Sequence, residues 1–229
     1  MLREWFKIMI HRFCGYKISG SNFNRFSYDK RNFQLHTEKP VIFDVGANIG
    51  QSVYWFKSEF YKSIIYAFEP FPYTYKKLKK NTKNFHFVKH FNVAISNSNC
   101  FLNVRPYKRC EGTAKLEEVS GPDSITVKCL TVDSFCVENN INFIDIIKID
   151  TEGHELKVIN GAKEMLSKGK IGNIIIEASI FENDIQHTML KKISQKLEEY
   201  NYNIKSFYDL SHKNNGELNY MNVHFVRGE

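Results

Sequence analysis

Residues 41–50 read VIFDVGANIG, a short apolar run followed by two glycines. The β-branched and aromatic residues at 41–45 are typical of a strand buried on both faces. Gly46 has no Cβ, so the chain can turn sharply there and a ligand can come close. Gly50 allows the next segment, which we predict to be a helix, to pack tightly on the strand. The first amides of that helix would face the turn and suit a polar or anionic group.

A carboxylate follows the next apolar segment. Residues 64–68 read IIYAF and precede Glu69, so a second parallel strand would bring this side chain to the same edge of the sheet. An ionised carboxylate is a pure acceptor and can take both hydroxyls of a ribose. Each such charge-assisted bond contributes roughly 1.5–3 kcal/mol. The two strands therefore predict a nucleotide pocket.

The small residues of the turn indicate which nucleotide it binds. The dinucleotide fingerprint is G-x-G-x-x-G, whereas this chain has Asp44-x-Gly46-x-Asn48-x-Gly50. Asn48 stands in the place of the middle glycine and tolerates left-handed backbone better than most residues. Asp44 is unfavourable beside a pyrophosphate but suits an ammonium group. The pattern favours S-adenosylmethionine (SAM) over NAD; the alternative is a strand–turn–helix unit that binds no ligand.

A second motif strengthens this interpretation. Residues 142–155 read NFIDIIKIDTEGHE, another apolar strand that ends in polar side chains. At this point the chain resembles the FkbM-type methyltransferase family, a branch of the Rossmann-like SAM-dependent enzymes. The resemblance covers residues 40–180 and does not reach the segment before them. The matching segments are Phe43–Gly50, Ala67–Pro70, Asn92–Ser96, Lys148–Glu155, Ile159–Ala162 and Ile174–Glu177.

The resemblance implies a fold and a set of cofactor contacts. The fold would be α/β, of the Rossmann-like class I methyltransferase type: a mostly parallel seven-stranded sheet with helices on both faces and an antiparallel C-terminal edge strand. Residues 150–154 would face the transferred methyl group. The implied cofactor contacts are Asp44, Gly46, Ala47, Asn48 and Gly50 at the methionine end, Glu69 at the ribose, Asn92 and Ala94 near the adenine, and Asp150.

Length and composition fit one α/β domain. The chain has 229 residues, of which 42% are hydrophobic, enough for one substantial core. We expect residues 40–229 to form the methyltransferase domain and residues 1–39 a helical cap segment. No apolar run is long enough for a spanning helix, charges interrupt any signal-peptide core, and the five cysteines lack zinc-ligand spacing. These features predict a cytoplasmic protein.

The basic character of the chain has a plain explanation. Much of the net charge of +7 lies in Lys76–Lys83, on the helix expected after Glu69, where we interpret it as a solvated outer face. No interleaving of arginine with aromatic residues suggests an RNA path. Pro70-Phe71-Pro72-Tyr73 looks like the loop of adenine-N6 methyltransferases, but it follows the second strand instead of the fourth. We therefore expect no nucleic-acid partner.

The amino-terminal segment allows two interpretations. Leu2, Trp5, Phe6, Met9 and Phe13 fall on one face of a basic amphipathic helix. Such a helix can lie on a membrane surface, which would make the cytoplasmic protein membrane-associated through residues 1–13. The alternative is a helix that covers the sheet or lines a homodimer contact.

The remaining elements follow from the apolar periodicity. We predict helices from residue 131, over 155–167 and over 185–200, and an antiparallel hairpin from 202–208 and 218–226 at the sheet edge. The insertion 106–123 contains Gly112–Leu116, which we interpret as a loop near the acceptor pocket. The further strands are expected at 84–95, 100–105, 125–130, 144–149 and 173–177.

Methyl transfer to a hydroxyl needs help from the protein. Positioning and exclusion of water supply most of the acceleration, but a sugar hydroxyl must also be activated by a base or a metal. His154 is the predicted base because its reference pKa lies near neutral pH; the alternative is a histidine that caps a helix or bonds a backbone carbonyl. Asp150 and Glu152, in the same motif, are the other predicted catalytic residues.

A metal is the second way to activate the hydroxyl. Asp150 ends the fourth strand of the expected parallel sheet and Glu177 ends the fifth, so the two carboxylates would be neighbours. Oxygen ligands with retained waters suit Mg²⁺. In the alternative, Asp150 orients the turn and Glu177 bonds backbone amides.

The resulting prediction is a SAM-dependent O-methyltransferase. The acceptor class rests on the resemblance, which implies a small-molecule or glycan acceptor: a hydroxyl of a sugar, a glycolipid or polysaccharide precursor, or a related metabolite. One alternative is an NAD-dependent oxidoreductase, since Tyr73-x-x-x-Lys77 and Tyr75-x-x-x-Lys79 have the spacing of its catalytic pair. The other is a non-catalytic SAM-binding module of the same fold.

Overall fold

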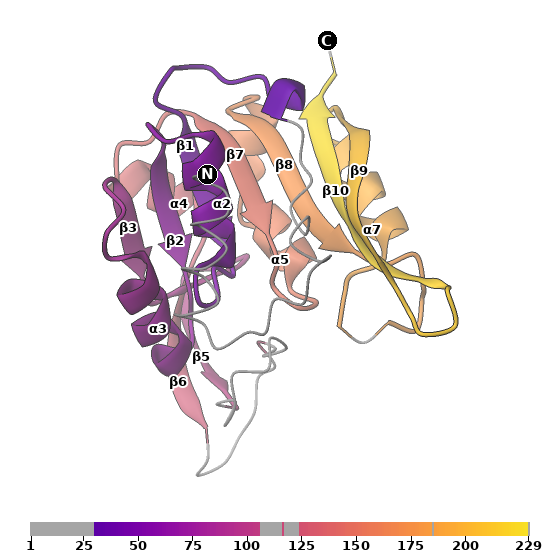
Figure 1. The fold of residues 1–229 in the computed structure, drawn as a ribbon, viewed down its shortest axis with the longest axis horizontal. Coiled ribbons are helices and arrows are strands. Elements are labelled where there is room, and N and C mark those ends of the chain that lie inside the picture. Colours follow the sequence, from indigo (N-terminus) through magenta and orange to yellow (C-terminus); the bar gives the residue numbers. More distant parts are fainter. Residues whose placement is uncertain (1–29, 106–115, 117–123, 185, 229) are drawn as a thin grey trace, which may run out of the picture.

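A seven-stranded sheet forms the centre of the molecule (Figure 1). The computed structural model describes residues 30–105, 116, 124–184 and 186–228, so the amphipathic segment 1–13 and nearly all of the insertion 106–123 lie outside the described residues. The strand order is β3-β2-β1-β7-β8-β10-β9. The strands are β1 (Val41–Val45), β2 (Ile64–Phe68), β3 (Val88–Phe91), β7 (Ile144–Ile149), β8 (Ile171–Ala178), β9 (Tyr202–His212) and β10 (Leu218–Arg227).

The predicted fold class is confirmed, with one refinement. Strands β3, β2, β1, β7 and β8 run parallel, while β10 runs antiparallel to both β8 and β9. The antiparallel C-terminal strand is therefore present, but it lies one place inside the edge, which β9 occupies. The carboxyl ends of β1, β2, β7 and β8 meet at the lower edge of the sheet in Figure 1.

Helices cover both faces of the sheet, because alternate side chains of the strands point to opposite sides. On one face Ile42 and Ile65 pack with Val53 of α2 (Gln51–Glu59) and Leu78 of α3 (Pro72–Thr82). On the other face Phe43 meets the Phe135 ring edge-on at 5.6 Å. The helices on that face are α4 (Val132–Glu138), α5 (Glu155–Asn160), α6 (Lys163–Ser167) and α7 (Leu190–Glu198).

Some predicted elements are wrong in their extent, among them the helix expected over 185–200, of which only Leu190–Glu198 is helical. The helix expected over 155–167 is broken into α5 and α6 at Gly161 and Ala162, where Gly161 packs so closely on the Ser96 carbonyl that a Cβ would lie 2.0 Å from that oxygen. The strand expected over 84–95 is also divided. After β3 the chain leaves the main sheet at Asn92, whose side-chain amide donates to the carbonyls of Glu69 at 2.9 Å and Pro70 at 2.8 Å.

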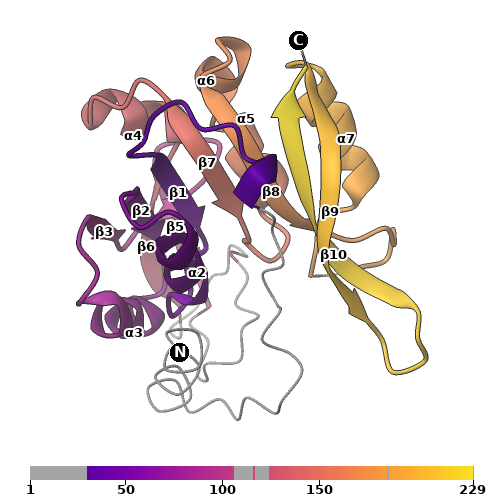
Figure 2. The same cartoon turned by 45° about the horizontal axis from the view of Figure 1, so that its top comes forward.

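A second sheet follows from that departure. It contains β4 (Ala94–Ile95), β6 (Ile125–Leu130) and β5 (Cys100–Val104) in this order, with β4 parallel and β5 antiparallel to β6. Its inner side chains form a small core of their own with Phe71. Figure 1 shows it next to α3, below the carboxyl edge of the main sheet, and Figure 2 gives the turned view.

The described end of the predicted cap segment packs on the domain. Phe33 follows a short 3₁₀ helix (Lys30–Asn32), is buried, and stacks on His224 at 4.8 Å. The Asp145 carboxylate accepts from the amides of His36 at 2.6 Å and Val41 at 2.8 Å. In the described part of the chain, none of the helices has the length and apolar character needed to cross a membrane.

Candidate functional site

The turn after β1 has the left-handed backbone that its sequence requires. The φ angles are +82° at Gly46, +48° at Asn48 and +100° at Gly50. The amides of Gly46 and Ala47 both donate to the Phe68 carbonyl, at 3.1 and 2.9 Å, so this turn is tied to the end of β2. A Cβ on Gly46 would lie 1.8 Å from the Asp150 carbonyl oxygen. The turns after β1 and β7 therefore touch, backbone against backbone.

This contact predicts a large effect of Gly46→Ala on stability. The substitution adds a backbone clash to the strain of a positive φ, and we expect the free energy of unfolding to fall by roughly 3 kcal/mol or more. Gly216→Ala is the matched control, since Gly216 has a similar φ of +85° with nothing within 4 Å of its Cβ position. It should cost only the conformational strain, about 1–2 kcal/mol. Urea unfolding measures both, and equal losses would contradict the clash.

Asp44 places a carboxylate without a full set of partners beneath the turn. It is fully buried in β1, and its Oδ2 accepts from Ser52 Oγ at 2.5 Å. Its Oδ1 has no hydrogen-bond partner among the described residues. Burial raises the pKa of Asp44 to about 6, although Lys148 and the Ser52 hydroxyl act in the opposite direction. A buried acceptor that lacks a donor fits an ammonium group.

Glu69 lies at the end of β2, next to the same turn. Its Oε2 accepts from the Asn48 amide and its Oε1 from the Phe71 amide, each at 3.0 Å. A carboxylate has about four acceptor positions, so lone pairs remain for a ligand. Burial raises the pKa of Glu69 to about 8. The nearby Asp44 and Asp150 also raise this pKa, whereas the two amides lower it.

Lys148 is a site residue that the sequence motif contained but that we did not predict. It is in register with Asp44 on the neighbouring strand, is only 3% exposed, and its Nζ lies 2.6 Å from Asp150 Oδ2. Burial favours the neutral amine, but Asp150, Asp44 and Glu177 together raise the pKa of Lys148 above its usual value. A lysine among the four isoleucines of this strand was the signal for it.

Three carboxylates gather at the ends of β7 and β8. One oxygen from each of Asp150, Glu152 and Glu177 lies within 4.8 Å of the other two. Burial and the neighbouring carboxylates raise the pKa of Glu152 to about 8 and that of Glu177 to about 7. Burial also favours a higher pKa for Asp150, but Lys148 holds the pKa of Asp150 below the usual range. Glu152 also has a positive φ of 54°, a strained conformation that clusters at functional sites.

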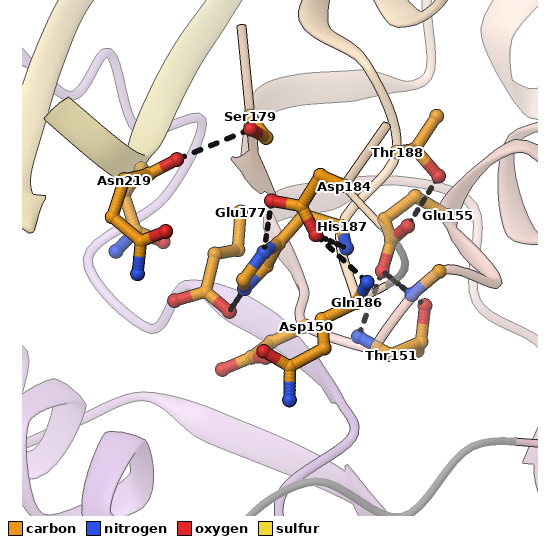
Figure 3. Close-up of polar contacts among 12 residues, drawn as sticks. Asp150, Thr151, Glu155, Glu177, Ser179, Asp184, Gln186, His187, Thr188 and Asn219 are labelled. Carbon is orange, nitrogen blue, oxygen red and sulfur yellow. Dashed lines mark hydrogen bonds and ion pairs between the residues drawn. The ribbon is translucent and has the colours of Figure 1, made fainter. Parts of the chain in front are cut away.

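Glu155 organises the turn that carries these carboxylates (Figure 3). Its Oε1 accepts from Thr151 N at 3.1 Å, Thr151 Oγ1 at 2.9 Å and Gly153 N at 3.0 Å. Its Oε2 accepts from Thr188 Oγ1 at 2.5 Å. The side chain is therefore fully used in shaping residues 151–153 and in joining them to the loop before α7.

His154 has a different environment from the three carboxylates. It is 5% exposed, and its Nε2 lies 2.9 Å from Ser96 Oγ. Burial lowers its pKa to about 4, with a smaller contribution from Lys157. It precedes α5 as the N-cap residue, although its side chain makes no cap hydrogen bond. These contacts join the turn after β7 to the segment after β4. Ala94, the other residue expected near an adenine together with Asn92, is buried in β4.

The Tyr-x-x-x-Lys pairs lie elsewhere. Both are on α3, where Lys77 Nζ lies 4.7 Å from the centre of the Tyr73 ring and Lys79 Nζ lies 5.7 Å from that of Tyr75. Tyr73 is 59% exposed. These are cation–π contacts along a solvated helix.

Comparisons with known proteins agree with the fold. The model of the methyltransferase FkbM domain matches residues 44–204. The 2-O-methyltransferase NoeI of Sinorhizobium fredii is 30% identical over 151 residues, which are 58% of this chain and 62% of NoeI. The hexuronic acid methyltransferase AglP of Haloferax volcanii is 28% identical over 167 residues, 72% of this chain and 67% of AglP.

A solved structure shows the same fold at low sequence identity. Methyltransferase FkbM from Methylobacillus flagellatus superposes with a TM-score of 0.59 and 16% identity, covering 87% of this chain and 46% of that one. This chain thus spans less than two thirds of NoeI and about half of the solved relative. The FkbM domain model, in contrast, matches most of this chain. The chain belongs to the FkbM family of SAM-dependent methyltransferases.

Proposed function

We propose that this chain is a SAM-dependent O-methyltransferase that acts on a sugar hydroxyl, in a free sugar or in a glycan, glycolipid or polysaccharide precursor. The observation that carries the proposal is a pair of buried carboxylates at neighbouring strands. Among the described residues, Asp44 Oδ1 has no hydrogen-bond partner and Glu69 accepts from only two amides. The names of two relatives support the acceptor class: one is a 2-O-methyltransferase and the other acts on a hexuronic acid.

Two of the described side chains suit particular groups of SAM. Asp44 is suited to the ammonium of the methionine end, and Glu69 to the ribose hydroxyls. Asn92 and Ala94 remain the proposed neighbours of the adenine. When bound, SAM supplies the methyl group as an electrophile on its sulfonium.

The ionisation of Asp44 gives a prediction for pH. Because burial raises its pKa to about 6, the carboxylate becomes protonated as the pH falls through 6, and an ammonium group prefers the ionised form. We expect SAM affinity to fall by up to about tenfold per pH unit below pH 6. Titration calorimetry between pH 5 and 7.5 measures this. Asp44→Asn should bind SAM more weakly and lose the added steepness below pH 6, while the pH dependence that Glu69 contributes below pH 8 remains. A wild-type profile no steeper below pH 6 than that of Asp44→Asn would rule the role out.

The acceptor hydroxyl is activated, in this proposal, by Glu152 as general base. Lys148 contacts Asp150 and His187 contacts Glu177, whereas the Glu152 carboxylate has no hydrogen-bond partner among the described residues. We prefer it to His154, whose Nε2 is bonded to Ser96 and whose pKa is lowered to about 4, which makes it a weak base. His154 then serves as a link between two turns.

Mg²⁺ is the second candidate for this step. The spacing of Asp150, Glu152 and Glu177 suits a cation with oxygen ligands, and its charge would relieve the repulsion among them. Against it, Lys148 already supplies a positive charge to Asp150 at 2.6 Å.

The test of the proposed function has two parts. SAM, but not NAD, should raise the melting temperature of the protein, as binding to the folded state requires. Mixed with SAM and a panel of neutral sugars, uronic acids and oligosaccharides, the protein should release S-adenosylhomocysteine with at least one acceptor. Stabilisation by NAD alone would overturn the proposal. Binding of SAM without transfer to any glycan would favour a non-catalytic module or another acceptor class.

A further inference from the structure

The loop between β8 and α7, residues 179–189, is held closed at its base. Ser179 and Met189 form a parallel β-bridge. The Ser179 amide donates to the Thr188 carbonyl at 3.2 Å, and the Leu190 amide donates to the Ser179 carbonyl at 2.7 Å. We call this segment the β8–α7 loop; Ile185 within it lies outside the described residues. None of its side chains was predicted to belong to the site.

His187 is a buried side chain of this loop with contacts on several sides. Its Nδ1 lies 3.0 Å from Asp184 Oδ2, while Asp184 Oδ1 accepts from the amides of Gln186 at 2.7 Å and His187 at 3.0 Å. Its ring stacks on Tyr220 of β10, with ring centres 4.4 Å apart and planes at 26°. The residue is 8% exposed. The imidazole is thus held on one edge by its own loop and on one face by the sheet.

The other edge of the ring faces the carboxylate cluster (Figure 3). His187 Nε2 lies 3.4 Å from Glu177 Oε2, and Glu177 in turn lies beside Asp150 and Glu152. A carboxylate next to two others is repelled by them, so its position depends on the positive or hydrogen-donating groups around it. His187 is such a group from the loop side, and Lys148 is its counterpart from inside the sheet.

We propose that His187 is a positioning residue, which holds the Glu177 carboxylate against Asp150 and Glu152 and so joins the β8–α7 loop to the methyl-transfer site. Through the adjacent Thr188, the same loop also bonds Glu155, which shapes the turn of residues 151–153. Two consecutive side chains of one loop therefore tie it to both sides of the cluster. This inference rests on the proposed function, because it assigns the cluster to the acceptor hydroxyl.

Two amide substitutions separate the two hydrogen bonds of the ring. In His187→Gln the amide nitrogen can reach the place of Nε2 and donate to Glu177. In His187→Asn it can replace only Nδ1 and donate to Asp184. If His187 acts through Glu177, His187→Asn should lower kcat by about 10–100-fold, the range for lost outer-shell support, and His187→Gln by about threefold or less. The SAM dissociation constant should stay within about twofold in both, because Asp44 and Glu69 are untouched.

The controls and the contrary outcomes are well defined. His86→Asn and His86→Gln, at an exposed histidine after α3, should leave kcat unchanged. Equal losses in both His187 variants, or a larger loss in His187→Gln, would mean that the ring serves only Asp184 and the loop. Unchanged kcat in both would also overturn the inference.

Crystal structures of the His187 variants test the inference independently of the proposed function. If the wild type binds SAM but transfers methyl to no glycan, the proposed function fails, and the position of Glu177 in His187→Asn is then the deciding observation. The carboxylate should move away from Asp150 and Glu152 in His187→Asn and stay in His187→Gln. An unmoved Glu177 in His187→Asn would refute its positioning by His187.

Discussion

Glu69→Ala should weaken SAM binding by about a hundredfold or more. The proposed ribose contacts are two charge-assisted hydrogen bonds, each worth roughly 1.5–3 kcal/mol, and 1.4 kcal/mol corresponds to about tenfold in affinity. The carboxylate is 4% exposed, so water does not compete for it as it does at the surface. Hydroxyl donors favour the ionised form of a group whose pKa burial has raised to about 8. SAM binding should therefore release a proton when measured between pH 6 and 8.

The measurement must separate binding from folding. Glu69 also accepts from the amides of Asn48 and Phe71, so alanine leaves two donors without their partner and should lower the melting temperature as well. Titration calorimetry well below that temperature isolates the affinity. Glu69→Gln keeps one acceptor oxygen and should lose less affinity, while Glu38→Ala, at an exposed surface ion pair, should lose none. If Glu69→Ala binds SAM within about threefold of the wild type, the ribose role is wrong.

The strands were the part of the fold that the sequence predicted best. β1, β2 and β7 begin and end where their largely apolar runs do, because a buried parallel strand needs little beyond a short run of β-branched residues. The errors came where tertiary contacts override the periodicity. Asn92 turns the chain out of the main sheet by bonding two carbonyls more than twenty residues earlier. Gly161 interrupts a helix because Ser96 packs on it.

The candidate site also contains residues that local sequence rules predict and residues that only tertiary contacts reveal. The meeting of Asp44, Gly46 and Glu69 at one edge of the sheet could be predicted, since each follows a local rule for the end of a parallel strand; their contacts with SAM stay a prediction. Lys148, Glu155 and His187 were missed as site residues, because their roles depend on partners brought together by folding. Glu155 meets Thr188 across 33 positions of sequence. His187 meets Glu177 only because the β8–α7 loop folds back on its own strand. His154 looked like a base from its type alone, and its contact with Ser96, 58 positions away, is what argues against that role.

Glu152→Gln should lower kcat for methyl transfer by roughly 10²–10⁴-fold, the usual contribution of a general base, with little change in SAM affinity. Glutamine keeps the size of the side chain but cannot take a proton from the acceptor. His154→Gln should cost far less in kcat and act mainly on stability, because the ring it replaces is buried against Ser96. The kcat values of these two variants, measured under saturating SAM, show whether Glu152 or His154 is the base.

Removal of metal decides what the cluster does. If Glu152 is the base and Lys148 is the resident cation of the cluster, wild-type activity should survive excess EDTA within about twofold. Loss of activity in EDTA that Mg²⁺ restores would assign the three carboxylates to a metal, whose charge then activates the hydroxyl. Glu177→Gln tests the same question. If Glu177 is a metal ligand, the substitution should raise the Mg²⁺ concentration needed for half-maximal rate, because weaker ligation requires more free metal. If Glu177 is only a neighbour of the base, that concentration should not change.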